Sequence, residues 1–354
     1  MVISRRSLLS AGAAFPASAY GQCVTDRFTV DACMGGVHGS SGPPGMTLDL
    51  NFMFPGSLDP RITFTRASTA TYTDASGTIQ TAATNAPRWD YAGGSLRGLL
   101  IEEARTNLLL NSATLGTQSV TVTAQAYTLS FYGTGTITKS GAATGALVGT
   151  GAGQRVSQTF TPTAGSLTLT VTGSVLNAQI EAGSFVTSWI PTTSVAVTRA
   201  QDSCTISAAN MTPWFAPPGG SWFAEFIDFN PTSALTPRVI AYPLAGNIYT
   251  LAAGTGLNAY EYDGAGAVST SNSFSPNTVV KAVSTWAAGA AKICLNAGVV
   301  TLSVTLSGGF AGFASAGVQF MANATAGDGM SGYIRRVQYW PRVLSDAEMQ
   351  QVTT

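Results

Sequence analysis

Apolar and polar residues alternate with a period of two through much of the chain. The alternation is clear over residues 62–66, 127–131 and 167–172, where threonine and serine separate aliphatic and aromatic residues. Strands with one buried face have this period, and β-branched and aromatic residues are frequent in them. Turn residues separate such stretches at intervals close to the roughly 8–12 residues typical of a β-sandwich. Because long amphipathic helical patterns are missing from the sequence, we predict an all-β protein.

Changes in this pattern divide the chain into five segments. The phrase GGVHGSSGPPG has no periodicity and consists mostly of turn residues, which predicts a linker before the first strand. We expect an N-terminal extension or signal over residues 1–22, the linker over 23–45, a β module over 46–112, a jelly-roll sandwich over 113–203 and a second sandwich over 204–354.

The composition argues against two classes of partner. Charged residues make up 10% of the 354 residues, the formal net charge is zero, and no basic run occurs. A nucleic-acid-binding face needs clustered Lys and Arg side chains, so we expect no nucleic-acid partner. No apolar run approaches the roughly 20 residues of a membrane-spanning helix, so we expect no membrane insertion.

The β module over 46–112 is rich in arginine. Two carboxylates, Glu102 and Glu103, follow the apolar phrase GLLI near its end. Adjacent side chains on a strand point to opposite faces, so these two would not form the carboxylate pair of a glycosidase. A guanidinium pairs well with carboxylates, and we predict salt bridges that hold the module together. The arginines of this stretch are Arg61, Arg66, Arg88, Arg97 and Arg105.

The same stretch contains two distinctive phrases, ITFTRASTATYTD from Ile62 and GLLIEEARTNLL from Gly98. Both are similar to the motif segment of bacteriophage head-spike and tail-fibre proteins. The resemblance implies a virion appendage with other virion structural proteins as partners, and no catalytic chemistry belongs to the motif. Related spikes are often trimeric, so the resemblance also allows a homotrimer.

Residues 178–200 carry a second phage-like signature, AQIEAGSFVTSWIPTT followed by VTRA. This ending resembles the closing segment of the jelly-roll modules that follow the spike motif in phage fibres. Such modules are themselves similar to carbohydrate-binding modules, so the resemblance implies a second domain of that architecture.

Residues 204–354 resemble the laminin-G-like or concanavalin-like lectin sandwich in three places. SWFAEFIDF has the pattern of a long strand with aromatic residues on both faces, WAAGAAKICLNAG reads as two paired strands, and GYIRRVQYW reads as the last core strand. Ser345 and Glu348 then have the spacing of a capping box at the start of a short terminal helix. The resemblance places Trp222, Phe226 and Trp286 in the core, while Trp214 fits either core or surface.

The N-terminus supports two interpretations. Arg5 and Arg6 precede a short apolar run rich in glycine and alanine, and Ala17-Ser18-Ala19 follows it. This order resembles a twin-arginine export signal, which implies a secreted, extracellular protein. The alternative is an ordinary N-terminal extension of a virion appendage, which is released by lysis and needs no export.

Four cysteines and one histidine limit the possible metal and disulfide chemistry. No CxxC motif occurs, and His38 is the only histidine, so we expect no zinc site. The even count allows disulfides, for instance Cys23 with Cys33 and Cys204 with Cys294, and the alternative is four separate thiols. His38 lies in the predicted linker, a poor place for a catalytic base that needs a held geometry.

The acidic residues of the second sandwich suggest neither catalysis nor a cofactor. Glu225 and Asp228 are three apart on a predicted strand and therefore face opposite sides. Asp263 and Asp328 lie in glycine-flanked loops, where turn formation explains them. A loop aspartate could hold calcium, as in some lectins of this class, but no DxDxDG-like run supports a calcium site. We expect no cofactor and no enzymatic activity.

The best local candidate for a sugar-binding site lies in the second sandwich. Binding a saccharide needs exposed aromatic faces together with amide and carboxylate hydrogen-bonding groups. Two tyrosines with the same strand parity lie beside a carboxylate at a predicted Asp-Gly turn. The alternative is that these tyrosines pack the edge of the sandwich. The candidate residues are Tyr260, Glu261, Tyr262 and Asp263, with Asn247 and Tyr249 nearby in sequence.

Three hypotheses for function follow. The first is a non-enzymatic phage or prophage-derived spike or fibre protein that binds a bacterial surface polysaccharide through its C-terminal lectin-like domain. The second is a secreted bacterial adhesin exported by the twin-arginine route. The third is a polysaccharide depolymerase, although the long parallel β-helix repeat usual in such enzymes is missing from the sequence.

Overall fold

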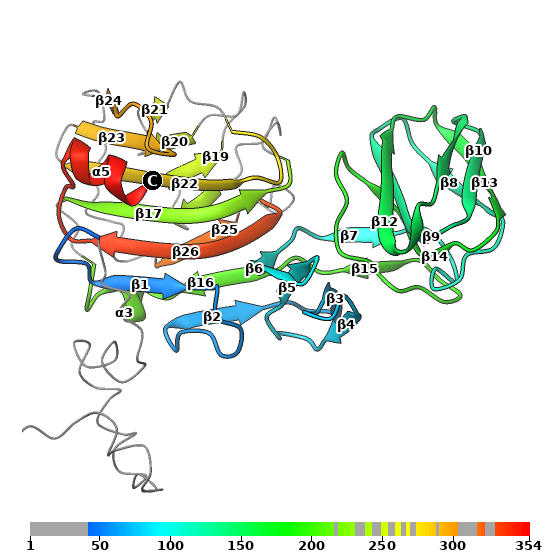
Figure 1. Cartoon of the computed structure of the whole chain (residues 1–354), viewed down its shortest axis with the longest axis horizontal. Coiled ribbons are helices and arrows are strands. Elements are labelled where there is room, and N and C mark those ends of the chain that lie inside the picture. The colour runs from blue at the N-terminus through cyan, green and yellow to red at the C-terminus, as the bar shows by residue number, and fades with distance from the viewer. Residues whose placement is uncertain are drawn as a thin grey trace, which may run out of the picture. The chain divides into compact units, whose positions relative to one another are not determined.

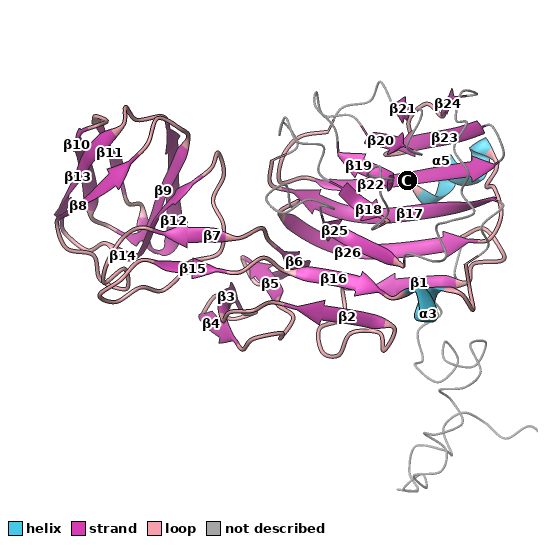
Figure 2. Cartoon of the chain, turned by 180° about the vertical axis from the view of Figure 1, so that it is seen from behind, coloured by secondary structure: helices cyan, strands magenta, loops and turns pink. Residues whose placement is uncertain are grey.

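Strands make up most of the structure (Figures 1 and 2). The computed structural model describes residues 42–215, 219–230, 238–242, 249–253, 259–262, 267–269, 274–287, 290–303, 317–322 and 330–354. Within these ranges the helices are α3 (Ala208–Met211) and α5 (Asp346–Val352), and neither is long and apolar enough to cross a membrane. The prediction of an all-β protein is confirmed. The predicted signal, Cys23, Cys33 and His38 lie outside the described residues.

The C-terminal sandwich is built from two antiparallel sheets. Eight strands form the first sheet, in the order β24–β23–β22–β17–β26–β6–β5, with β1 also paired to β26. These strands are β1 (Leu48–Asn51), β5 (Trp89–Ala92), β6 (Ser95–Ile101), β17 (Gly219–Asp228), β22 (Val279–Ala287), β23 (Ala290–Leu295), β24 (Thr301–Ser303) and β26 (Gly332–Trp340).

Seven strands form the second sheet, in the order β2–β16–β25–β18–β19–β20–β21. They are β2 (Ile62–Thr65), β16 (Ser203–Ile206), β18 (Arg238–Ala241), β19 (Tyr249–Ala253), β20 (Ala259–Tyr262), β21 (Ala267–Ser269) and β25 (Val318–Ala322).

Side chains that alternate along β17 show which face of the first sheet is directed at the second sheet. Trp222 and Phe226 lie in the core between the sheets, whereas Phe223 packs on the other side with Leu344 and Met349. The helix α5 lies against β22 and β23 of the first sheet (Figure 1).

Strands from the predicted module over 46–112 complete this sandwich, so the predicted boundary at residue 204 is wrong. β1, β5 and β6 lie in the first sheet and β2 in the second. Leu50, Leu99 and Ile101 pack in the same core as Trp222 and Phe320. The physical reason is the long strand β26, which would otherwise expose a row of unpaired backbone N–H and C=O groups along one edge. β1 pairs with one half of that edge and β6 with the other.

A second, smaller sandwich is formed by residues that lie in sequence between the N-terminal strands and the C-terminal strands of the first sandwich. Its sheets have the strand orders β11–β10–β13–β8 and β12–β9–β14. Leu129, Phe131, Ile137 and Ile180 are among the buried residues of its core. Its strands are β8 (Gln118–Val122), β9 (Tyr127–Gly133), β10 (Thr136–Gly141), β11 (Gly145–Val148), β12 (Gly151–Phe160), β13 (Gly165–Thr172) and β14 (Leu176–Ala182).

Short pairings connect the two sandwiches. The chain enters the smaller sandwich after β7 (Arg105–Asn107) and leaves it before β15 (Val197–Arg199), and these two strands pair with each other. β3 (Ala70–Thr73) and β4 (Ile79–Ala82) form a separate antiparallel hairpin. The chain therefore returns to the first sandwich beside the point at which it left.

The predicted core residues and the predicted helix cap are confirmed. Trp222, Phe226 and Trp286 are all buried, and so is Trp214, whose ring meets that of Trp222 edge-on with 5.8 Å between centroids. Of the two interpretations of Trp214, the core is therefore the right one. Ser345 caps α5 by accepting a bond from the Glu348 N–H, and the Glu348 carboxylate accepts one from the Ser345 N–H.

The predicted Cys204–Cys294 disulfide is wrong, because both cysteines are free and buried. Cys204 lies in the core between the sheets. Cys294 lies on the outer side of the first sheet, where it packs with Trp340 and Met349. A disulfide needs Cα atoms within about 7 Å and side chains directed at each other, which this arrangement prevents. Burial raises the pKa of Cys204 to about 12, so this thiol stays protonated and unreactive.

Candidate functional site

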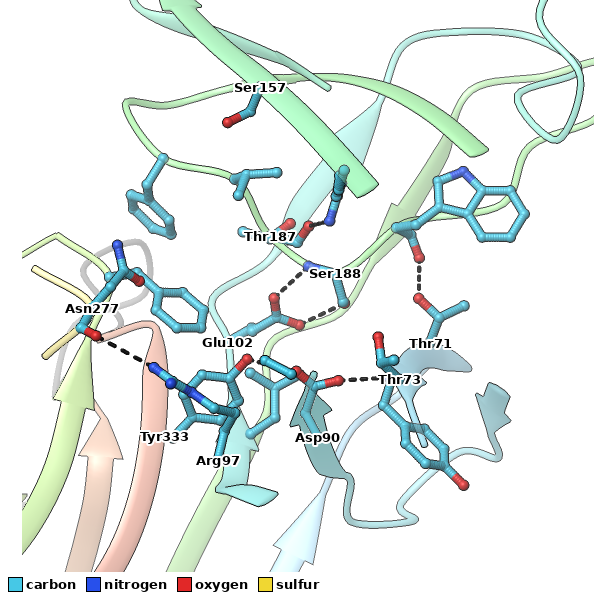
Figure 3. Close-up of a pocket in the computed structure, with 18 of the residues that line it drawn as sticks. Thr71, Thr73, Asp90, Arg97, Glu102, Ser157, Thr187, Ser188, Asn277 and Tyr333 are labelled. Carbon is cyan, nitrogen blue, oxygen red and sulfur yellow. Dashed lines mark hydrogen bonds between the residues drawn. The ribbon is translucent and has the colours of Figure 1, made fainter. Parts of the chain in front are cut away.

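A cavity of about 800 Å³ lies between the two sandwiches. One part of its wall comes from the hairpin β3–β4 and from β5, and another from β9, β12 and the segment 184–189 of the smaller sandwich. The C-terminal sandwich contributes a third part through Phe229, Asn277 and Tyr333 (Figure 3). Segments far apart in the sequence therefore share one site.

Strand alternation explains the polar wall that the smaller sandwich contributes. The β9–β12 register places Arg155 opposite Tyr132, Ser157 opposite Ser130 and Thr159 opposite Thr128. Residues directly opposite each other lie on the same face of a sheet, and all of these except Ser130 line the cavity. The intervening Leu129 and Phe131 point the other way, into the core. The same period-two pattern thus builds the core and one wall of the cavity.

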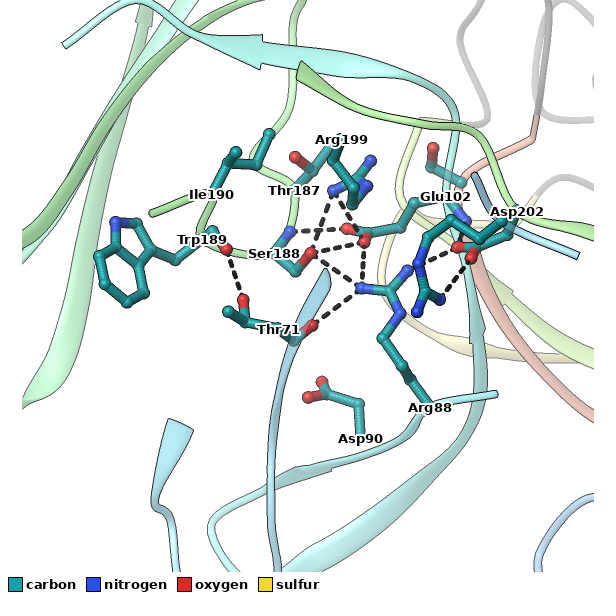
Figure 4. A network of polar contacts seen from close by, with 12 residues as sticks. Thr71, Arg88, Asp90, Glu102, Thr187, Ser188, Trp189, Ile190, Arg199 and Asp202 are labelled. Carbon is teal, nitrogen blue, oxygen red and sulfur yellow. Dashed lines mark hydrogen bonds and ion pairs between the residues drawn. The ribbon is translucent and has the colours of Figure 1, made fainter. Parts of the chain in front are cut away.

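Glu102 is the most heavily bonded carboxylate at the cavity (Figure 4). Its Oε1 accepts the Ser188 N–H at 2.6 Å, and its Oε2 accepts the Ser188 hydroxyl at 2.7 Å. Arg88 and Arg199 form ion pairs with the same Oε2 at 2.8 and 2.9 Å. Burial by itself would raise the pKa of Glu102, but the charges of Arg199 and Arg88 and the Ser188 bonds outweigh it and hold that pKa at about 2.

A second buried carboxylate, Asp202, extends this network away from the cavity. Asp202 Oδ1 accepts from Arg66 Nη1 at 3.0 Å, and its Oδ2 accepts from Arg88 Nη2 and from the Glu102 N–H. Both side chains of the Arg66–Asp202 pair and of the Arg88–Asp202 pair are fully buried. Arg88 therefore bridges the two carboxylates. The predicted pairing of Arg66, Arg88 and Arg105 with carboxylates is confirmed, the last through its bond from Nε to Glu103 Oε1 at 2.6 Å.

Asp90 and Tyr333 form a second polar pair in the cavity wall. The Tyr333 hydroxyl donates to Asp90 Oδ2 at 2.6 Å, and the Thr73 N–H donates to Asp90 Oδ1 at 2.6 Å (Figure 3). Burial raises the pKa of Asp90. Burial and the neighbouring Asp90 raise the pKa of Tyr333 well above its usual value.

Aromatic rings surround these polar groups. Phe185 and Phe229 meet with 6.2 Å between ring centroids, and Phe229 meets Tyr333 at 5.1 Å. The half-buried rings that line the cavity are those of Tyr72, Tyr91, Tyr132, Phe185, Trp189, Phe229 and Tyr333. Half-buried rings next to hydroxyl, amide and guanidinium groups suit a ligand with both apolar faces and hydroxyl edges, because binding pockets combine apolar surface with a few placed polar groups.

Protein donors surround the carboxylate of Glu102. A general acid or base needs a lone pair or proton that is free for the substrate, and protein donors already occupy both oxygens of Glu102. A raised pKa makes Tyr333 a weak nucleophile. In the described part of the chain, no cluster of three or more His, Cys, Asp or Glu side chains could hold a metal ion.

Four of the six sugar-binding residues predicted from sequence belong to β19 and β20 of the second sheet. The register of β19 and β20 places Tyr249 opposite Tyr262 on neighbouring strands, and Tyr260 and Glu261 belong to β20. Asn247 and Asp263 lie outside the described residues, as does Asp328.

Two acidic residues of the C-terminal sandwich have roles that the sequence did not indicate. Glu225 forms an ion pair with Arg335 at 2.6 Å. Asp228 is buried, its Oδ2 has no hydrogen-bond partner, and burial raises its pKa to about 7. Asp228 ends β17 directly before Phe229 and Asn230, which line the cavity.

Sequence reasoning missed most of the cavity residues. Among these residues, Arg155 could have been identified from the sequence. It alternates with apolar and polar neighbours in a predicted strand, and the other residues of the same parity are Ser157 and Thr159. Asp90 and Tyr333 are 243 positions apart and carry no local signal.

Comparisons with known proteins give structural similarity only. No family model matches the chain, and no curated protein matches its sequence. A carbohydrate-binding module of the IT-sialidase of Ruminococcus gnavus, bound to α2,3-sialyllactose, is similar at 14% identity and a TM-score of 0.32, covering 39% of this chain and 83% of that one. Domain 4 of the arabinanase AbnA of Geobacillus stearothermophilus, in complex with arabinotriose, is similar at 10% identity and a TM-score of 0.34, covering 44% of this chain and 73% of that one. A pentraxin of Limulus polyphemus is similar at 11% identity and a TM-score of 0.31, covering 40% and 73% of the two chains.

Proposed function

We propose that this chain is a non-enzymatic glycan-binding protein and that its binding site is the cavity between the two sandwiches. The observation that carries the proposal is the lining of that cavity, where seven half-buried aromatic rings lie among hydroxyl, amide and guanidinium groups. A sugar ring can stack its C–H face on an aromatic ring while its hydroxyl groups bond to polar side chains at the edge.

The absence of catalysis is part of the proposal. It is supported by the full set of donors on Glu102 and by the raised pKa of Tyr333. A depolymerase would need a carboxyl group whose oxygens are free to exchange a proton with the glycosidic oxygen.

The biological setting that we propose is a phage or prophage-derived spike or fibre, with a bacterial surface polysaccharide as ligand. The support is the resemblance of the phrases ITFTRASTATYTD and GLLIEEARTNLL to the motif of that class. Weak single sites would then act together through several copies on one particle, which raises the effective affinity without new contacts. Recovery of the protein in purified phage particles would support this setting, and recovery as a free secreted protein would favour an adhesin.

The site is tested by comparing two tyrosines on a glycan array with the full chain. Tyr91→Ala removes a ring from the cavity, and Tyr262→Ala removes one from the β19–β20 region predicted from sequence. We expect Tyr91→Ala to lose binding with an unchanged melting temperature and Tyr262→Ala to keep it. The opposite result would move the site to the second sheet, and an array without any bound glycan would contradict the proposed function.

A further inference from the structure

Two arginines of the cavity differ from most others in the described part of the chain. Ion pairs with carboxylates are formed by Arg61, Arg66, Arg88, Arg105, Arg199, Arg335, Arg336 and Arg342. Arg97 and Arg155 have no carboxylate within 4.0 Å among the described residues, and both line the cavity. Both of these cavity arginines therefore lack a carboxylate partner among the described residues.

Arg155 is held in place by neutral acceptors. Its Nη1 donates to the Thr187 carbonyl at 2.7 Å, and its Nη2 donates to the Ser130 hydroxyl at 2.9 Å. The guanidinium also lies 5.9 Å from the centroid of the Tyr132 ring. Each terminal nitrogen carries two N–H groups and uses one in these bonds, so one remains on each side of the fork. A fork of this kind matches the two oxygens of a carboxylate.

Arg97 is bound more loosely. Its Nη2 donates to the Asn277 carbonyl at 3.3 Å, and its guanidinium lies 5.7 Å from the centroid of the Tyr333 ring (Figure 3). Neither contact offsets its charge, and a side chain that is held by one long bond can adjust to a ligand.

The acidic groups near the cavity do not compensate for these charges. Glu102 is neutralised by Arg88 and Arg199, and Glu103 is paired with Arg105. Glu181 is buried and accepts bonds from Gln179 and Thr187. Asp90 is the remaining acid in the wall, where Thr73 and Tyr333 occupy both of its oxygens.

From this charge distribution we infer that the cavity selects a glycan that carries carboxylate groups, such as a uronic acid polymer, with Arg155 and Arg97 as the specificity-determining residues. The inference rests on the proposed function, because it names the ligand class of the same site. A neutral glycan would leave both guanidinium groups without a counter-charge, whereas a sugar carboxylate would accept a bidentate bond from Arg155.

The test uses matched pairs of polysaccharides, each in its acidic form and in its carboxyl-reduced, neutral form. Affinity for the full chain is measured at low and moderate salt. We expect the acidic form to bind at least about tenfold more tightly, with a preference that weakens as salt rises. Arg155→Gln should abolish the preference, because it should lower the affinity for the acidic form much more than the affinity for the reduced form. Arg336→Gln, which changes an arginine paired with Asp49 outside the cavity, is the matched control.

Arg155→Lys covers the case in which Arg155→Gln does not fold. Lys keeps the charge but not the fork, so part of the acidic preference should remain. Equal binding of the acidic and reduced forms, or an acidic preference unchanged in both Arg155→Gln and Arg97→Gln, would overturn the inference and leave the proposed function standing. If no polysaccharide of either kind binds, both the inference and the proposed function are contradicted.

Discussion

The Ser188 hydroxyl donates to Glu102 Oε2 at 2.7 Å, although 86 positions separate the two residues. Ser188 belongs to the segment that follows the last strand of the smaller sandwich, and Glu102 follows β6 of the larger one. Arg88 and Arg199 meet at the same carboxylate (Figure 4). One buried carboxylate thus links both sandwiches at the wall of the cavity.

Removal of Arg66 is expected to destabilise the protein strongly. Arg66→Ala leaves Asp202 Oδ1 without its partner and removes donors from the carbonyls of Ser68, Ala83 and Ala86. Breaking a buried ion pair in this way costs about 3–5 kcal/mol of unfolding free energy. Arg336→Ala breaks a solvent-exposed pair with Asp49 and should cost about 0–1 kcal/mol. Urea denaturation of both variants measures the two losses of unfolding free energy. Equal losses would show that the ion pair and hydrogen bonds of Arg66 contribute little to the stability of the fold.

Acid should weaken the junction between the sandwiches through Glu102. The folded-state pKa of about 2 lies below the unfolded value of about 4.3. The unfolded state therefore binds more protons in this interval, so the stabilisation is complete above about pH 4.3 and is lost as pH falls toward about 2. Melting temperatures measured across this range should fall in the wild type. Glu102→Gln should have a lower melting temperature than wild type at pH 6, and its melting temperature should fall less between about pH 4.3 and about pH 2. If the melting temperatures of the two proteins fall in parallel with pH, Glu102 is not the group that causes the loss of stability.

Asp228 should have the opposite effect. Its folded-state pKa of about 7 lies above the unfolded value of about 3.9, so the native state binds more protons between these values and stability falls as pH rises through them. Asp228→Asn should melt at a higher temperature than wild type at pH 8, with the difference shrinking toward pH 5. A lower melting temperature for Asp228→Asn at pH 8 would mean that the charged carboxylate has a stabilising partner.

Residues 204–354 alone are expected not to fold cooperatively. They lack β1, β2, β5 and β6 and with them Leu50, Leu99 and Ile101 of the shared core. A fragment that spans residues 43–354 keeps all these strands and should show one cooperative thermal transition with a far-UV strand signature. A sharp transition of the shorter fragment, at a melting temperature near that of the longer one, would show that the N-terminal strands are dispensable.

Cys204 and Cys294 should resist both oxidation and labelling. Both are buried, and burial raises both of their pKa values, so the reactive thiolate is scarce. In a Cys23→Ser/Cys33→Ser background, a thiol reagent should label neither cysteine until denaturant is added. Oxidant should leave the melting temperature unchanged, and a rise that disappears in Cys294→Ser would restore the disulfide hypothesis.

The sequence by itself determined the class of fold and the local elements. Period-two alternation depends only on neighbouring residues, so it correctly indicated strands such as β9 and β13. The burial of Trp222 and Trp286 was expected instead from the resemblance to the lectin sandwich. The capping box at Ser345 is equally local, because its two partners are three positions apart. The concentration of arginines before Glu102 also indicated ion pairing, because few other partners for a buried carboxylate occur in that stretch.

Only the tertiary structure decided which strands pair and where a site forms. Alternation fixes which face of a strand is buried but not which strand lies beside it, so nothing local shows that β1 and β6 both pair with β26. An even number of cysteines likewise does not show which of them lie close together. It suggested a bond between Cys204 and Cys294, but these two residues lie in separate hydrophobic clusters. The cavity depends most on this long-range order. Arg155, Asp90 and Tyr333 line it together because three distant segments meet, and Asp90 and Tyr333 carry no local sequence signal.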